Sequence, residues 1–290
     1  MYTYNLFQWI LLFYIYCFLG WCVESTIVST RERRFINRGF LKGPMLPIYG
    51  TGTILILFVS LPLKEYPILV YIAGLISTTI LEYFTGWLME TIFKIKYWDY
   101  TDDKFNYKGR ICLVSSLFWG VLTLFAVYVI HNPISNFVTN LSDITTITIS
   151  VIASILFVSD VIYSAYNVLD LNKILGFMTG IKKEMENLSS QIKEKAPSTD
   201  LSAIKEKLSS LKLEYDKYAS KVNFFHKQII KSYPSASSKK FNEAFKFLKD
   251  KIENAFYKKR WTTLDSNGFG FEVQKRFSHW KSQAFSPKNS

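Results

Sequence analysis

The chain has 290 residues, 49% of them hydrophobic and 17% aromatic, and a formal net charge of +12 at pH 7. The charge is uneven, because residues 1–169 are nearly neutral at +1 while residues 170–290 carry +11. A neutral, apolar first part and a basic second part exclude an ordinary soluble domain. They indicate a membrane-embedded region followed by a water-exposed one.

Several function classes lack their motifs. The chain has no Gly-x-x-x-x-Gly-Lys-[Ser/Thr] phosphate loop, so it cannot energise transport by itself in the P-loop manner. The histidines and cysteines form neither a catalytic pattern nor a metal-ligand spacing. We therefore expect no enzyme activity, no cofactor and no metal. Lysines of the basic tail alternate with apolar residues, which favours anionic inner-leaflet lipids as a partner over nucleic acid.

Uncharged runs predict five membrane spans, which makes the fold class an all-α, polytopic membrane protein. The predicted transmembrane domain covers residues 1–169, with spans at about 4–23, 45–62, 67–93, 111–130 and 144–169. No basic region precedes the first span, so it should stay in the mature chain. Basic loops follow the first and third spans, which places the N-terminus outside and the C-terminus in the cytoplasm. His131-Asn132-Pro133 is then a polar outer loop.

One sequence pattern occurs twice. Residues 18–25 read Phe-Leu-Gly-Trp-Cys-Val-Glu-Ser, and residues 84–91, displaced by 66 positions, read Phe-Thr-Gly-Trp-Leu-Met-Glu-Thr. The same offset relates Lys42-Gly43 to Lys108-Gly109. Two blocks with one offset favour a duplicated helical hairpin over chance likeness between aromatic-rich membrane segments. The duplication pairs Trp21 and Glu24 with Trp87 and Glu90.

Four acids interrupt the spans or their inner ends. A rise of about 1.5 Å per residue places all four in the cytoplasmic third of the bilayer. An intramembrane carboxylate costs roughly 2.5 to 3.5 kcal/mol, so each is expected to face other helices, water or a basic partner. The alternative is that they are structural and pair with loop arginines. The four acids are Glu24, Glu82, Glu90 and Asp160.

Two further stretches favour a site near the inner end of the spans. Glu82, Gly86 and Glu90 lie on one stripe of the third span, which either allows close helix packing or lines a cavity. The start of the second span, residues 43–52, contains two prolines and three glycines. It predicts irregular backbone at the membrane edge, which lipid does not tolerate unless protein or water satisfies it. The alternative is a plain loop before a shorter helix.

The second inner loop, residues 97–109, is rich in aromatic and acidic residues. Trp98 and the tyrosines are expected at the headgroup level. Asp99, Asp102 and Asp103 are too weak a signal for a cation site.

The tail, residues 170–261, is predicted to be a cytoplasmic coiled-coil helical domain. Apolar residues recur with a period near 3.5 over residues 174–192 and again over 201–229. Pro197-Ser198-Thr199-Asp200 between these arms favours an antiparallel hairpin, with Ser198 or Thr199 as cap. Two parallel dimeric coiled coils remain the alternative. A third amphipathic helix is expected to end at residues 258–261, and residues 262–290 are expected to be flexible.

Taken in order, the motifs resemble those of the CmpB-like, type IV ABC-transporter permease family. They are the Gly-Trp-x-x-Glu end of the first span, Gly43-Pro44-x-x-Pro47-Ile48-Tyr49-Gly50, Glu82-Tyr83-x-x-Gly86, Trp98-Asp99-Tyr100 with Asn106-x-x-Gly109, and Phe241-Asn242-Glu243-Ala244. The resemblance implies a permease-like protein of a bacterial plasma membrane. It carries no catalytic residues over, and it implies a separate ATPase subunit.

The expected function is a permease-like membrane subunit with an inward-facing site built from the duplicated hairpins. The alternatives are a scaffold or sensor that uses its coiled coil for a cytosolic partner or a second copy, and a lipid-acting enzyme using Glu82 or Asp160. The candidate cargo-binding residues are Trp21, Glu24, Glu82, Gly86, Trp87, Glu90 and Asp160. The candidate residues of the site loops are Gly43, Pro44, Pro47, Tyr49, Gly50, Trp98, Asp99, Asn106, Gly109 and Arg110.

Overall fold

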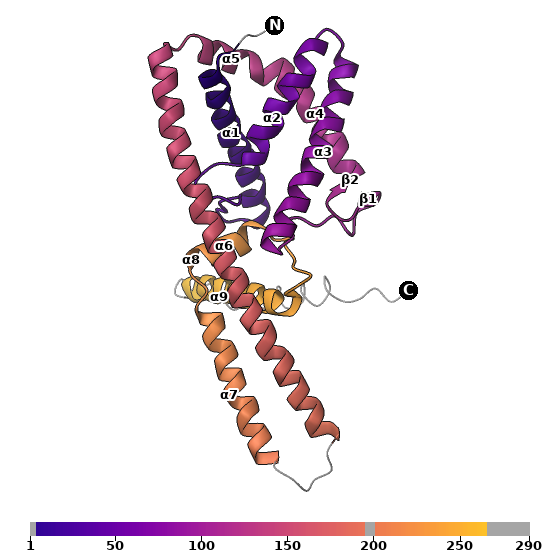
Figure 1. Ribbon diagram of the computed structural model, residues 1–290, viewed down its shortest axis with the longest axis vertical. Coiled ribbons are helices and arrows are strands. Elements are labelled where there is room, and N and C mark those ends of the chain that lie inside the picture. Colours follow the sequence, from indigo (N-terminus) through magenta and orange to yellow (C-terminus); the bar gives the residue numbers. More distant parts are fainter. Residues whose placement is uncertain (1–3, 195–200, 266–290) are drawn as a thin grey trace. The chain divides into compact units, whose positions relative to one another are not determined.

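The structure is a computed structural model that describes residues 4–194 and 201–265, and it divides into two compact units, residues 1–245 and 246–290. Its elements are almost all helices (Figure 1). In chain order they are α1 (Leu6–Glu32), α2 (Pro47–Ser60), the 3-10 turn η1 (Leu61–Leu63), α3 (Pro67–Phe93), β1 (Asn106–Tyr107), β2 (Ile111–Cys112), α4 (Leu113–Phe125), the π-helical turn η2 (Ala126–Ile130), α5 (His131–Thr139), α6 (Asp143–Glu194), α7 (Leu201–Ser220), α8 (Phe224–Ser232) and α9 (Asn242–Asp265).

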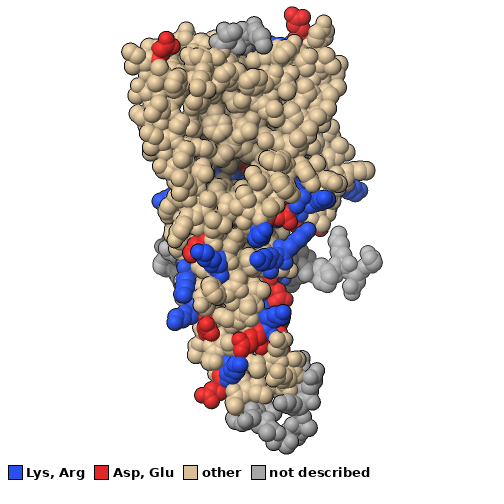
Figure 2. All heavy atoms as spheres, in the orientation of Figure 1, with Lys and Arg blue, Asp and Glu red and all other residues tan. Residues whose placement is uncertain are grey.

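Four helical stretches in the described part of the chain are long and apolar enough to cross a membrane. They are Leu6–Glu32, Pro67–Phe93, Leu113–Thr139 and Asp143–Ile192, whereas the helix at the second predicted span, Pro47–Leu63, is shorter. The all-helical membrane architecture is therefore confirmed, while five full spans remain a prediction. On the face shown in Figure 2, charged side chains gather at and below one end of the apolar helices. We call this the basic end.

Helices α1, α2, α3 and α4 pack in sequence order, and α6 also packs against α1 (Figure 1). Glycines allow the closest approaches. A Cβ at Gly50 would overlap Phe13 and Cys17 of α1, and a Cβ at Gly74 would overlap Thr123 of α4. In the first half of α3, the absence of a side chain at Gly74 therefore serves close helix packing.

The predicted outer loop at His131-Asn132-Pro133 is wrong. Helix α4 continues through the π-helical turn η2 into α5, and His131 is fully buried. Its ring nitrogens lie 3.0 Å from the Tyr4 hydroxyl and 3.1 Å from the Tyr16 hydroxyl, so Tyr16 of α1 and Tyr4, which lies just before that helix, satisfy its polarity.

Helix α6 runs without a break through residue 169, where the fifth span was predicted to end, and α7 packs beside its second half (Figure 1). Glu184 contacts Lys207 at 2.9 Å, and the Phe177 and Tyr218 rings stack at 5.1 Å. Phe177 precedes Glu184 in α6, whereas its partner Tyr218 follows Lys207 in α7, so the two helices are antiparallel. The connecting turn at residues 197–200, its cap and residues 266–290 lie outside the described residues.

The apolar period over residues 201–229 predicted one continuous helix, and this prediction is wrong at one point. Helix α7 ends at Ser220, and a new helix, α8, starts after Asn223. The Asn223 side chain accepts from the His226 backbone N–H at 2.8 Å, and His226 Nδ1 accepts from the Asn223 N–H at 3.3 Å. This capping box marks the start of α8. The apolar period does not predict the break, because it continues across residues 221–223.

Candidate functional site

A buried carboxylate lies between α3 and α4 near the basic end. Glu82 of α3 is only 5% exposed. The Ser115 hydroxyl lies 3.0 Å from both carboxylate oxygens, and the Trp119 indole N–H donates to Oε2 at 3.2 Å. The Tyr100 hydroxyl donates to Oε1 at 3.1 Å. Within residues 4–194 and 201–265, no basic side chain forms an ion pair with Glu82.

A second carboxylate adjoins it. The Tyr49 hydroxyl of α2 donates to Glu24 Oε1 at 2.8 Å, and Arg38 Nε lies 3.4 Å from Glu24 Oε2. The Tyr49 ring lies 5.4 Å from the Trp119 ring, which links the two carboxylates through an aromatic pair. Helices α1 to α4 and the loop before β1 all contribute. We call this set the carboxylate cluster: Glu24, Tyr49, Glu82, Tyr100, Ser115 and Trp119.

Tyr100 enters the cluster from the loop after α3, outside the membrane helices. Burial and the nearby Glu82 carboxylate raise the pKa of its phenol above the usual value. The hydroxyl therefore keeps its proton at neutral pH and remains a hydrogen-bond donor to Glu82.

The two copies of the duplicated motif meet different surroundings. Trp21 donates its indole N–H to Asn37 Oδ1 at 2.5 Å, whereas Trp87 is 42% exposed on the surface of α3. Glu90 accepts from Arg110 Nε at 3.0 Å and from its Nη2 at 2.8 Å. Each motif glutamate thus lies near an arginine of the loop that follows its helix. Glu90 accepts two hydrogen bonds from Arg110 at 3.0 Å or less, whereas Glu24 lies 3.4 Å from Arg38. The closer pair makes Glu90 a structural anchor.

Asp160 of α6 holds the loop that precedes α2. Its carboxylate accepts the backbone N–H groups of Lys42 at 3.1 Å and Gly43 at 2.7 Å. The Ser164 hydroxyl adds a third hydrogen bond at 3.1 Å. In this arrangement the carboxylate accepts from two backbone N–H groups of the loop and from Ser164 of its own helix, so Asp160 positions the loop instead of lining the carboxylate cluster.

The irregular backbone predicted for residues 43–52 is present only up to Leu46. Helix α2 begins at Pro47, where proline is well tolerated, and Gly50 lies inside it. Pro44 belongs to the non-helical segment before it. The Leu46 N–H donates to the Cys17 carbonyl at 3.0 Å, which fastens the end of this segment to α1. The alternative of a plain loop before a shorter helix therefore holds here.

The second inner loop is held by its own motif residues. Lys96 Nζ contacts Asp99 Oδ1 at 2.7 Å, and Asn106 Oδ1 accepts the Gly109 N–H at 3.0 Å. Gly109 has a φ of +63°, and a Cβ there would overlap Lys96 and Asp99. Trp98 donates its indole N–H to the Arg110 carbonyl at 2.9 Å, and Gly86 leaves room for the Trp98 ring. These contacts stabilise the loop conformation that places the Tyr100 hydroxyl beside Glu82.

The segment Ser232–Ser238, between α8 and α9, contacts both inner loops, and sequence reasoning missed it. We call it the docking segment. The Ser232 hydroxyl donates to the Asn37 carbonyl at 2.5 Å, and the Ser238 hydroxyl donates to the Lys94 carbonyl at 2.7 Å. Ser237 and Lys96 exchange backbone hydrogen bonds at 2.8 and 2.9 Å. The Arg38 guanidinium also stacks on the Tyr233 ring at 4.4 Å.

Of the predicted cargo-binding residues, the structure brings together Glu24 and Glu82, joined by the site-loop residue Tyr49. Trp87, Glu90 and Asp160 lie apart from them in other contacts. Sequence reasoning missed Tyr100, Ser115 and Trp119. The spacing of Ser115 and Trp119 by four residues was a usable signal, because it puts both on one face of a helix.

A bundle of long apolar helices with carboxylates buried near one charged end defines a polytopic helical membrane protein. The family model described as "Putative ABC-transporter type IV" matches residues 11–165, just over half of the chain. The chain belongs to this family. The match covers the helices that form the carboxylate cluster and ends within α6. No curated protein and no solved structure matches the chain.

Proposed function

We propose that the chain is the membrane subunit of a transport system and that the carboxylate cluster is its cargo site. The observation that carries this proposal is the setting of Glu82, which is buried among neutral hydrogen-bond donors without a basic partner in the described residues.

Hydrogen-bond donors orient a carboxylate, but they do not neutralise it. A charged group inside a membrane protein is costly, and side chains of this kind mark substrate and ion pathways. Glu90, by contrast, has Arg110. A cargo with a cationic group supplies the missing positive charge at Glu82, and Tyr100, Ser115 and Trp119 hold the carboxylate in place to receive it. The proposed cargo class is therefore a cation or a cation-bearing small molecule.

The basic end faces the cytoplasm in this proposal. Loops 33–46 and 94–110 carry most of the lysines and arginines of the membrane region, and such loops stay on the cytoplasmic side. The carboxylate cluster then lies near the inner surface of a plasma membrane, which makes the site inward-facing.

A separate ATPase energises transport in this account. The family supports an association with an ATPase subunit, and the 290 residues contain no P-loop motif of their own. The inner loops form the surface nearest the carboxylate cluster, because Tyr100 belongs to one loop and Arg38 to the other. An ATPase bound there acts directly on the residues that hold the cluster.

A membrane-anchored scaffold or sensor is the second candidate. Helix α6 continues unbroken from the apolar bundle into the hairpin with α7. The hairpin exposes Leu213 by 73% and Phe177 by 56%, so it offers apolar side chains to a cytosolic partner. In that case the hairpin, and not the carboxylate cluster, carries the function.

Isolation of the chain from its native membrane in mild detergent separates the two candidates. The transport proposal expects a P-loop ATPase in the purified complex, and ATP hydrolysis that differs between the wild type and Glu82→Gln. Its matched control is Glu65→Gln, which alters an exposed glutamate near the opposite end of α3. A complex without an ATPase, whose partner disappears when residues 180–219 are deleted, overturns the transport proposal in favour of the scaffold.

A further inference from the structure

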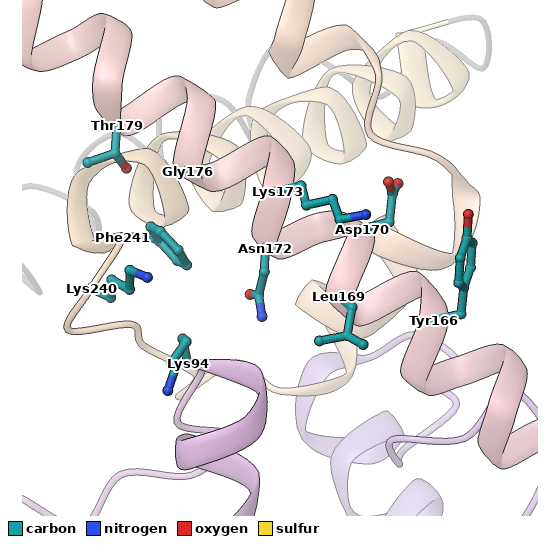
Figure 3. A pocket seen from close by; sticks show the side chains of 10 residues that line it. All are labelled: Lys94, Tyr166, Leu169, Asp170, Asn172, Lys173, Gly176, Thr179, Lys240 and Phe241. Atoms are coloured by element: carbon teal, nitrogen blue, oxygen red, sulfur yellow. The ribbon is translucent and has the colours of Figure 1, made fainter.

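A second feature of the basic end is a cavity of about 650 Å³ that the carboxylate cluster does not use. Its lining comes from α6, from the residue after α3 and from the last two residues before α9 (Figure 3). Gly176 keeps it open, since the nearest atom to a Cβ placed there is Phe241 Cε1 at 3.8 Å. The lining residues are Lys94, Tyr166, Leu169, Asp170, Asn172, Lys173, Gly176, Thr179, Lys240 and Phe241.

The charge of this lining is positive. Lys94, Lys173 and Lys240 come from three separate segments, and Asp170 is the single acid in the lining. The Asp170 carboxylate lies 3.6 Å from His226 Nε2. In the described part of the chain, none of the three ammonium groups forms an ion pair with a carboxylate. The cavity therefore presents cationic donors that an anion would satisfy.

The apolar part of the lining lies on the membrane side. The apolar run of α6 ends at Leu169, and Asp170, Asn172 and Lys173 follow it. Tyr166 is 70% exposed and Leu169 is 44% exposed just before that change, where an acyl chain would contact them. Aromatic and aliphatic side chains at the edge of a span, with lysines immediately beyond it, match the order of acyl chain and headgroup in a phospholipid.

We propose that this cavity binds a phosphate group, and that its source is the headgroup of an anionic phospholipid whose acyl chains lie along Tyr166 and Leu169. Lys94 and Lys240, which lie on the same side of α6 in Figure 3, contact the phosphate, and Lys173, which points toward Asp170 there, adds positive charge at the rim of the cavity. Lys94 follows α3 and Lys240 lies in the segment before Asn242, so the bound headgroup joins α6 to the end of α3 and to that segment. The ligand also connects the membrane helices to the docking segment, since the Lys94 carbonyl accepts the Ser238 hydroxyl.

The test measures lipid binding by the purified full chain, by native mass spectrometry in detergent that contains either phosphatidylglycerol or phosphatidylcholine. We expect at least one phosphatidylglycerol to bind in preference to phosphatidylcholine. The variant Lys173→Glu/Lys240→Glu should weaken this binding at least about tenfold. The control Lys183→Glu/Lys239→Glu changes the net charge equally, at exposed positions outside the lining, and should leave binding unchanged.

A filling variant tests the cavity independently of charge. Gly176→Phe places a ring in the cavity, whereas Gly180→Phe, one turn further along α6, meets no atom within 4 Å of its Cβ. Only the first should lose the lipid. If inorganic phosphate binds to the protein and neither phospholipid does, a soluble phosphate compound is the source and the lipid assignment fails. Equal binding by both double variants, or equal binding of both lipids, overturns the proposal altogether.

Discussion

Gly43 donates its backbone N–H to the Asp160 carboxylate at 2.7 Å, across 117 positions of the chain. Lys42 donates to the same carboxylate, so one acid of α6 holds the loop that leads into α2. The first inner loop therefore depends on α6 for its position, and α6 is also the helix that continues into the hairpin. This contact makes Asp160 a structural residue that positions the loop before α2.

Asp160→Asn should lower the stability of the purified protein by about 1 to 3 kcal/mol, because an amide cannot accept from both N–H groups equally well. Thermal unfolding in detergent measures this effect. Ser164→Ala, which removes only the third hydrogen bond, serves as the control and should cost less. Unchanged stability of Asp160→Asn would contradict the anchoring role.

The docking segment should contribute to stability through its serine side chains. Ser232→Ala and Ser238→Ala each remove a hydrogen bond to a loop carbonyl, at an expected cost of about 1 kcal/mol. Hydrogen exchange of residues 232–241 and of loop 94–110 should quicken in both variants. Ser235→Ala, at an exposed position of the same segment, is the matched control. Exchange in loop 94–110 that stays the same in all three variants would argue against docking.

Docking of α8 on α6 should depend on pH through His226, which lies outside the membrane helices. Burial lowers the pKa of this histidine below its ordinary 6.5, against smaller raising effects of the Asn167 carbonyl and Asp170. The folded state then binds fewer protons than the unfolded state between the lowered pKa and 6.5. The stability that depends on neutral His226 is therefore fully present above about pH 6.5 and is lost as the pH falls below it.

Hydrogen exchange of α8 at pH 7.5 and 5.5, corrected for the intrinsic pH effect, measures this dependence. In the wild type, the amides of α8 should exchange faster at pH 5.5 than at pH 7.5. His226→Gln keeps a polar side chain without a titratable group in this range, so its opening should differ little between the two values. An equal pH response in both proteins would assign the titration to another group.

The orientation of the membrane region can be tested with single cysteines at exposed positions. Glu65→Cys and Ser142→Cys should react with a membrane-impermeant maleimide added to intact cells, whereas Lys104→Cys and Asn187→Cys should react only after permeabilisation. Of the native cysteines, Cys17 and Cys112 are buried and Cys22 is partly exposed, so the labelling of the protein without an added cysteine is subtracted. External labelling at Lys104→Cys would reverse the orientation and the inward-facing site with it.

Sequence reasoning succeeded where one local pattern determines the structure. The predicted third span, residues 67–93, coincides with α3, because Pro67 suits the first turn of a helix and Lys94 follows the apolar run. The cost of a carboxylate in lipid was enough to predict that Glu82 faces other helices, and Glu82 is buried between α3 and α4. In each case the deciding residues are neighbours in the chain, so composition and spacing contain the information.

Sequence reasoning failed where a distant segment satisfies a polar group. His131 suggested a loop because its partners, Tyr4 and Tyr16, lie more than a hundred positions away. Tyr100 reaches Glu82 only because its loop folds back between Lys96 and Gly109, which no helical period describes. The docking segment is polar and short, and its two contact loops precede it by about 140 to 200 positions. Such contacts depend on tertiary packing, which spacing along the chain does not encode.

The most direct test of the cargo site compares the small molecules that copurify with wild-type protein, Glu82→Gln and Asp160→Asn in mild detergent. The comparison uses mass spectrometry on folded material with matched elution profiles. The account predicts a cation or cation-bearing compound that the wild type retains, that Glu82→Gln loses at unchanged stability, and that the folded fraction of Asp160→Asn still holds. An identical set of bound compounds in wild type and Glu82→Gln would contradict the assignment of the carboxylate cluster as the cargo site.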